Sequence, residues 1–137
     1  MASEESKSSN RSTTLWTAVV TGGASLASSS TNVLIADVND RDGLALAEEV
    51  KHKFSAEAVF QLVDVSCEDA LERMVKTVVD RWGRLDYAAN VAGTGETVSQ
   101  EEQSITVDAV NKAFAINQRG TRLCQEIEAE QMMSQDP

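Results

Sequence analysis

The sequence predicts an α/β fold built on a doubly wound parallel sheet, with about four strands and the helices that connect them. Short apolar runs rich in β-branched residues, each closed by turn-forming residues, alternate with longer segments whose apolar residues recur at helical spacing. A chain of 137 residues with 42% hydrophobic content has room for one such core. Ligands of this kind of fold bind at the carboxyl ends of the strands, so candidate site residues are sought there.

Composition limits the classes of partner. The chain has 22 acidic and 12 basic residues and a formal net charge of −10, which disfavours nucleic acid and anionic membrane surfaces. No apolar run approaches the length of a membrane span, and Cys67 and Cys124 lack the spacing of a disulfide framework or a zinc site. We therefore expect a cytoplasmic protein with no metal, no nucleic-acid partner and no membrane partner.

The folded domain is expected over residues 15–133, followed by a short tail at 134–137. Residues 1–14 are polar and contain acidic residues without an apolar segment, which argues against a targeting signal. We expect this leader to be disordered.

The first half of the domain begins with two strands. Residues 16–20 predict a buried strand that ends in a turn, and residues 32–37 predict a second. The serine-rich segment 24–32 predicts at most a short, weak helix. Asn39 or Asp40 then caps a helix. Its inward face is expected to hold Gly43, Ala47, Val50 and Phe54.

The second half begins with a strand predicted over residues 58–65. Ser66, with Asp69 three positions later, forms a variant of the capping box and opens the next helix. Gly83 is placed to end that helix, and residues 85–90 predict a fourth strand. The inward face of the helix is expected to hold Leu71, Met74, Val75, Val78 and Trp82.

The last predicted element is a long helix that ends near Met133. It follows the loop at residues 91–95 and an acidic polar stretch that extends to about residue 104. One face of this helix is expected to hold Val107, Val110, Phe114, Asn117, Thr121 and Cys124.

Four motifs, in order and each at the end of a predicted strand, resemble those of the short-chain dehydrogenase/reductase family. They are TGGAS at residues 21–25, Asp37, Asp64 with Val65, and NVAG at residues 90–93. The last is similar to the family's NNAG motif and is the most specific. The resemblance implies a Rossmann-like domain that binds NAD(P), present here in part and without the family's remaining strands.

The resemblance also implies cofactor contacts. Gly22, Gly23 and Ser25 would face the pyrophosphate, because glycine lets the backbone approach it and the next helix offers N–H groups. Asp37 would accept hydrogen bonds from the adenosine ribose and repel a 2′-phosphate, which favours NAD. Arg41 lies close enough in sequence to bind a 2′-phosphate, so NADP stays open.

Asp64 and Val65 would lie beside the adenine ring, and the Asp64 carboxylate would accept a hydrogen bond from the exocyclic amine of the ring. Asp64 would equally serve to cap the following turn, and the spacing leaves both interpretations open. Asn90, Ala92 and Gly93 complete the implied cofactor site.

Residues 114–121 resemble the family's long central helix, whose asparagine belongs to an Asn-Ser-Tyr-Lys catalytic set. Asn117 is the candidate for it. Outside that family frame, an asparagine within a helix is more often a satisfied polar residue. Arg119 either faces the cofactor or lies on a solvated helix surface.

The phosphate-binding segment departs from the family pattern. Only twelve residues separate Val20 from Val33, the lower limit of a crossover between parallel strands. Asp37 follows Gly22 by fifteen positions, where the dinucleotide fingerprint has about 20. Missing glycines and a shortened helix would weaken pyrophosphate binding by on the order of 1 kcal/mol or more.

The catalytic residues depart as well. The only tyrosine, Tyr87, is followed four positions later by Val91, so the Tyr-x-x-x-Lys pair of the family is absent. Proton transfer needs such a tuned donor. We therefore expect no dehydrogenase turnover from this chain alone, and a small-molecule substrate only if the chain is completed.

Three hypotheses follow. The first is an NAD(P)-dependent oxidoreductase of an alcohol or ketone, such as a natural-product intermediate, of which this chain is a part. The second is a non-catalytic, truncated remnant that binds nucleotide weakly, or that pairs with a full-length homologue as a homo- or hetero-oligomer through the last helix. The third is a chain without a stable fold, which would unfold without a cooperative transition.

Overall fold

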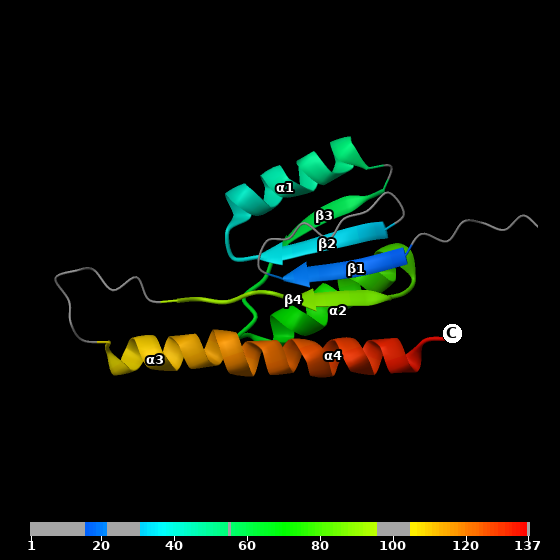
Figure 1. Cartoon of the computed structure of the whole chain (residues 1–137). Coiled ribbons are helices and arrows are strands. Elements are labelled where there is room, and N and C mark those ends of the chain that lie inside the picture. The colour runs from blue at the N-terminus through cyan, green and yellow to red at the C-terminus, as the bar shows by residue number, and fades with distance from the viewer. Residues whose placement is uncertain (1–15, 22–30, 55, 96–104, 137) are drawn as a thin grey trace, which may run out of the picture.

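The computed structural model describes residues 16–21, 31–54, 56–95 and 105–136. Within them, four parallel strands form one sheet in the order β3-β2-β1-β4 (Figure 1). The strands are β1 (Trp16–Thr21), β2 (Thr31–Asp37), β3 (Ala58–Leu62) and β4 (Tyr87–Asn90). The predicted fold class, a parallel α/β sheet, is confirmed.

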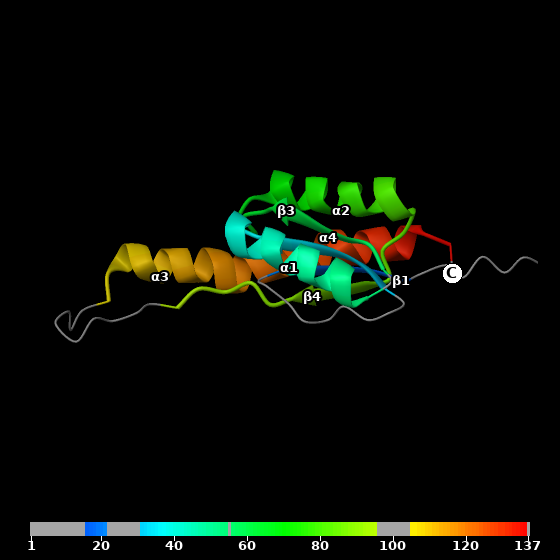
Figure 2. The ribbon, with the colours of Figure 1, turned by 90° about the horizontal axis from the view of Figure 1, so that it is seen from above.

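Helices cover both faces of the sheet. The helix α1 (Asp40–Lys53) lies on one face, and α2 (Glu68–Trp82) and α4 (Thr121–Ser134) lie on the other (Figure 2). Strand residues alternate between the two sides because successive side chains of a strand point to opposite faces. In β2, Val33 and Ile35 pack towards α1, and Leu34 packs towards α2 and α4.

The helical faces predicted for α1 and α2 are confirmed. Gly43, Ala47 and Val50 of α1 are buried, and the predicted α2 face is buried except for half-buried Trp82. Asn39 caps α1 as predicted, with its side-chain oxygen accepting the N–H of Asp42 at 3.2 Å. Gly83 ends α2 in the left-handed region at φ 83°.

The ends of two strands differ from the prediction. β3 ends at Leu62 rather than at residue 65, because the chain turns at Val65 and Ser66. β4 begins at Tyr87 rather than at residue 85. The N–H and C=O of Leu85 instead pair with the side chain of Gln135, at 3.0 and 2.5 Å.

The capping box predicted at Ser66 is wrong. Cys67 is the N-cap residue of α2 and makes no side-chain capping hydrogen bond. The Ser66 hydroxyl donates instead to Oδ1 of Asp64, at 2.7 Å. A nearby carboxylate is a stronger acceptor for this hydroxyl than the uncharged alternatives, and it holds the side chain away from the helix.

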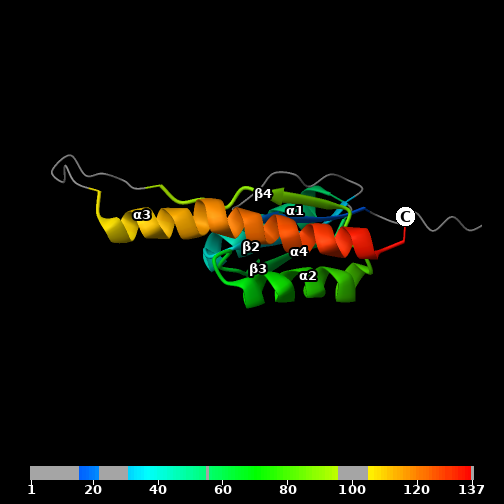
Figure 3. The same ribbon diagram turned by 90° about the horizontal axis from the view of Figure 1, so that it is seen from below.

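The last predicted helix consists of three parts: α3 (Val107–Phe114), the π-helical turn η1 (Ala115–Gly120) and α4. Of the residues predicted to share one helical face, Cys124 is buried, whereas Val107, Val110 and Phe114 are exposed. In Figure 3, α3 extends past the strands, where the described elements offer no surface to cover it.

Candidate functional site

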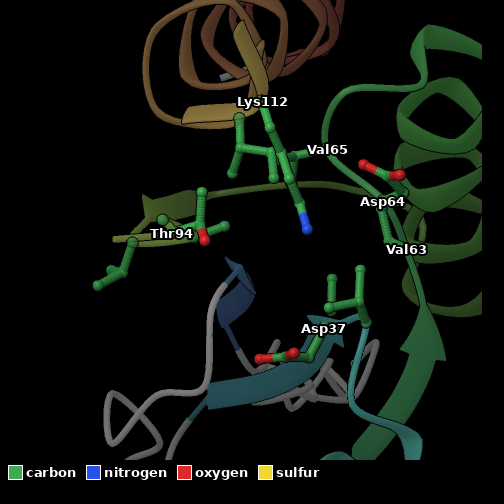
Figure 4. Close-up of a pocket in the computed structure, with 12 residues that line it drawn as sticks. Asp37, Val63, Asp64, Val65, Thr94 and Lys112 are labelled. Carbon is green, nitrogen blue, oxygen red and sulfur yellow. The ribbon is translucent and has the colours of Figure 1, made fainter. Parts of the chain in front are cut away.

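A cavity of about 280 Å³ opens at the carboxyl ends of the strands, under α3 and η1 (Figure 4). We call it the strand-end cavity. Parallel strands bring their carboxyl ends to one edge of the sheet, which is why residues far apart in the sequence meet here. Its lining residues are Ala36, Asp37, Val38, Val63, Asp64, Val65, Val91, Ala92, Gly93, Thr94, Lys112 and Ile116.

Asp37 is the last residue of β2 and lines the cavity. Its Oδ1 accepts the backbone N–H of Asn39 at 3.0 Å, which fixes the orientation of the carboxylate. Its Oδ2 makes no hydrogen bond with the described residues. The carboxylate is therefore held in place with acceptor capacity to spare.

Asp64 lines the same cavity and also caps the turn before α2. Its Oδ1 accepts the N–H of Ser66 at 2.9 Å and the Ser66 hydroxyl at 2.7 Å. These hydrogen bonds, the hydroxyl's first, hold the pKa of Asp64 below its usual range, with a smaller effect from Lys112. The capping interpretation is thus confirmed, and the carboxylate is ionised at neutral pH.

Lys112, which the sequence analysis did not single out, extends from α3 into the strand-end cavity. Its ammonium group points into the space between Asp37 and Asp64 (Figure 4). No ion pair within the described residues holds it. Two carboxylates and one ammonium group give the cavity a polar rim.

The turn after β4, residues 91–94, forms one wall of the cavity, and we call it the β4-end turn. Thr21, at the end of β1, supports it from below. The Thr21 hydroxyl accepts the N–H groups of Val91 and Ala92 at 3.2 and 3.3 Å. The backbone oxygen of Thr21 accepts the N–H of Val91 as well, at 3.1 Å.

Asn117 holds the same turn from the helical side. Its side-chain oxygen accepts the N–H of Thr94 at 2.7 Å, and its side-chain N–H donates to the Thr94 oxygen at 2.8 Å. A β-carbon at Gly93 would lie 3.4 Å from Asn117 Oδ1, so this side chain packs directly against the turn. Both polar atoms of Asn117 are thus committed to the backbone of the β4-end turn.

Asn90 precedes that turn, but its side chain lies outside the strand-end cavity. Its Nδ2 donates to Oε2 of Glu128 at 2.6 Å. Glu128 is 2% exposed, and this burial raises its pKa to about 7. The hydrogen bond from Asn90 has the opposite, smaller effect on the pKa. The sequence analysis missed Glu128, although it follows buried Cys124 by four positions on one helical face.

Arg119 also lies outside the lining. Its Nη1 donates to the backbone oxygen of Ser66 at 3.1 Å, which ties η1 to the turn after β3. Next to it, Gly120 is buried, and a β-carbon there would lie 2.8 Å from Val65. The π-helical turn therefore packs directly on the segment that carries Asp64 and Val65.

The structure brings together five of the predicted cofactor residues: Asp37, Asp64, Val65, Ala92 and Gly93. The predicted pyrophosphate contacts at Gly22, Gly23 and Ser25 lie outside the described residues, as do the leader and most of the segment 24–32. In the described ranges, no cluster of His, Cys, Asp and Glu is able to hold a metal ion. No described helix is long and apolar enough to cross a membrane.

Comparisons with known proteins agree with this geometry. A family model described as enoyl-(acyl carrier protein) reductase matches residues 23–136. The chain belongs to the short-chain dehydrogenase/reductase family. The short chain dehydrogenase/reductase astE of Aspergillus oryzae is 30% identical over 127 residues, 86% of this chain and 48% of that protein.

Two further relatives extend the family assignment. The (+)-borneol dehydrogenase 2 of Salvia officinalis is 34% identical over 112 residues, 75% of this chain and 39% of that protein. The crystal structure of levodione reductase matches with a TM-score of 0.76 at 28% identity, over 85% of this chain and 49% of that one. This member of the short-chain dehydrogenases/reductases, a family of NAD(P)-dependent oxidoreductases, spans about half the length of the relatives it matches.

Proposed function

We propose that the strand-end cavity binds the adenosine end of a nicotinamide dinucleotide, and that the chain is the nucleotide-binding part of an oxidoreductase of an alcohol or ketone. The observation that carries this proposal is the meeting of Asp37, Asp64 and the β4-end turn around one cavity. Relatives named for borneol, levodione and tropinone support the alcohol or ketone class.

The lining suits an adenosine. Asp37 has acceptor capacity for the ribose hydroxyls, and Asp64, with Oδ1 taken by Ser66, has Oδ2 for the exocyclic amine of adenine. Val63 and Val65 are buried and supply apolar walls for the flat ring. The bound dinucleotide would supply hydride chemistry, and the residues described here would bind and orient it.

NAD stands ahead of NADP in this proposal. The carboxylate of Asp37 at the cavity edge would repel a 2′-phosphate. Arg41, the residue that would favour NADP, is exposed in the first turn of α1 and does not line the cavity. NADP therefore remains the second cofactor candidate.

The proposed cofactor site includes further residues of the family pattern beyond the described lining of the strand-end cavity. Gly22, Gly23 and Ser25 would hold the pyrophosphate. Asn117 would be the asparagine of the catalytic set, and its position against Thr94 supports a positioning role for it within this chain. Arg119 and Asn90 are proposed to act through the segments they tie together.

Turnover and assembly are also proposals. We expect no dehydrogenase turnover from these 137 residues alone, because no Tyr-x-x-x-Lys pair is present to deliver a proton. The exposed apolar residues of α3 support pairing with a second copy or a homologue through the last helix. A cytoplasmic location remains a prediction from composition.

Isothermal titration of the full chain with NAD and with NADP tests the binding proposal. We expect NAD to bind more tightly than NADP, and Asp37→Asn to weaken NAD binding by about tenfold or more, because a charge-assisted hydrogen bond is worth roughly 1.5–3 kcal/mol. Asp69→Asn, which removes an exposed carboxylate of α2 outside the cavity, is the matched control and should bind as the wild type does. Absence of binding heat with both dinucleotides would contradict the proposal.

A further inference from the structure

Glu128 is a carboxyl group that the described residues bury almost completely, and unlike Asp86, whose side chain is 5% exposed and pairs with Arg84, it forms no salt bridge with a described residue. It lies on α4 at 2% exposure, and α4 packs beside β4. A groove of about 550 Å³ runs between the two elements. The groove is lined by Asp86, Tyr87, Ala88, Asn90, Gln125, Glu128, Ala129 and Met132.

The hydrogen bonding of Glu128 is incomplete in a specific way. Asn90 Nδ2 donates to Oε2 at 2.6 Å, but Oε1 of Glu128 and Oδ1 of Asn90, both buried, have no partner among the described residues. Two buried oxygen acceptors without a donor cost roughly 1–3 kcal/mol each. A single proton placed between them would satisfy both.

A carboxylic acid and a primary amide form a ring of two hydrogen bonds. In that ring, the amide N–H donates to one carboxyl oxygen, and the O–H of the other donates to the amide oxygen. The contact already present is the first of these, and the two unpartnered atoms are those of the second. This pattern of partnered and unpartnered atoms is the one that a neutral acid would complete, because a carboxylate has no O–H to donate.

The charged neighbours do not stabilise an ionised Glu128. Asp86, which directly precedes β4, and Tyr87, its first residue, line the groove, and Asp86 is already paired with Arg84 at 2.7 Å. From α4 itself, buried Cys124 lies one turn away, and burial, with a further effect of Glu128, raises its pKa to about 12.

The remaining charged groups around α4 lie elsewhere. From α2, Glu72 and Lys76 line a different groove. On α4, Arg122 and Glu126 pair with each other on the exposed surface. No described cation therefore faces Glu128, and an unpaired buried carboxylate is strongly disfavoured.

We propose that Glu128 is neutral in the folded chain and closes an acid–amide pair with Asn90, which makes it a positioning residue for the β4-end turn. Asn90 directly precedes residues 91–94, which form a wall of the strand-end cavity. The pair fastens the start of that turn to α4, as Thr21 fastens it to β1 and Asn117 to η1. When Glu128 ionises, the second hydrogen bond is lost and the hold on the turn weakens.

The direction of the pH dependence follows from linkage. The pKa of Glu128 rises from 4.5 to about 7 on folding. The acid form therefore stabilises the folded chain fully below about pH 4.5, and this stability is lost as the pH rises through about 7. The pH window of interest is thus about 4.5 to 7.

Urea unfolding of the full chain from pH 5 to 8.5 measures this linkage, with Glu128→Gln as the neutral isostere. We expect the unfolding constant of the wild type, divided by that of E128Q, to rise by up to about tenfold per pH unit up to about pH 7, and then to level off. Glu130→Gln removes an exposed carboxylate from the same helix and should give a profile parallel to that of the wild type. A wild-type profile parallel to that of E128Q would overturn the proposal.

Infrared spectroscopy tests the protonation state without any unfolding transition. At pH 6 the wild type should show the carbonyl band of a buried neutral carboxylic acid, and this band should disappear by pH 8.5. The E130Q variant should show the same band at pH 6. Only carboxylate bands at pH 6 would refute a neutral Glu128, even if E128Q fails to fold.

A coupling to nucleotide affinity rests on the proposed function, whereas the two measurements above do not. NAD binding by the wild type should weaken between pH 6 and 8 while that of E128Q stays constant. Constant affinity in both, together with the infrared band, would leave the acid–amide pair standing and exclude its effect on the cavity.

Discussion

Thr21 ends β1 at 1% exposure, and its side chain is one of the few buried polar groups of the molecule. The hydroxyl at this position accepts the N–H of Ala92, which has no backbone partner among the described residues, and shares the N–H of Val91 with the Thr21 backbone oxygen. Buried backbone N–H groups require such partners. One residue of β1 thereby shapes a turn 70 positions further along the chain.

Thr21→Val keeps the shape of this side chain and removes the acceptor. We expect the free energy of unfolding to fall by about 1–3 kcal/mol, because the N–H of Ala92 is left without its partner. Thr77→Val is the control, since its hydroxyl donates to Arg73 within one exposed helix, and it should change stability by less than about 0.5 kcal/mol. Urea unfolding of both variants measures the difference, and equal effects would contradict this role of Thr21.

Residues of the site were predictable from the sequence where they directly follow a predicted strand. Asp37 and Asp64 are carboxylates that directly follow apolar runs, so the sequence alone pointed to them. Lys112 gave no such signal. The π-helical turn η1 holds more residues per turn than an α-helix, so it rotates α3 relative to α4. A helical face predicted at 3.6 residues per turn therefore includes Phe114. In the structure Phe114 is exposed, and Lys112 lines the cavity instead.

Among the elements, α1 and β3 pack at unusually close range. A β-carbon at Gly43 of α1 would lie 2.1 Å from the ring of Phe60 in β3. Glycine is a poor helix former, so its presence in the second turn of α1 reflects this approach rather than helix propensity. The contact holds α1 on the face of the sheet opposite α2.

Gly43→Ala is expected to destabilise the chain by about 1–3 kcal/mol through overpacking, although alanine favours helix by roughly 1 kcal/mol. Phe60→Leu in the same chain shortens the opposing side chain, so the double variant should recover a large part of the loss. Thermal unfolding of the three variants forms the cycle. A single variant more stable than the wild type would show that the ring moves aside without cost.

Element ends were less predictable than element types. The strands and the inward faces of α1 and α2 follow from local patterns, which the sequence carries. The start of β4 depends on Gln135, fifty positions away, and the end of β3 depends on a hydrogen bond network at Asp64. Neither the distant contact of Gln135 nor the local side-chain hydrogen bond of Asp64 leaves a periodic trace in the sequence.

In the molecule as a whole, the order β3-β2-β1-β4 places the ends of β2, β3 and β4 around one cavity. Three separate supports, from β1, η1 and α4, hold the β4-end turn that closes it. A cavity with a preformed wall needs little ordering when a ligand binds, which favours affinity. The proposed recognition of adenosine therefore uses only residues that the structure describes.

The most direct test is a titration of the isotope-labelled chain with 5′-AMP, followed by the backbone amide signals in nuclear magnetic resonance. We predict that the signals of Asp37, Val65, Ala92 and Thr94 shift together with one dissociation constant. Signals from the groove between α2 and α4, such as those of Glu72 and Gln131, should stay in place. Shifts confined to that groove, or none at the cavity up to millimolar ligand, would contradict nucleotide binding at the strand-end cavity.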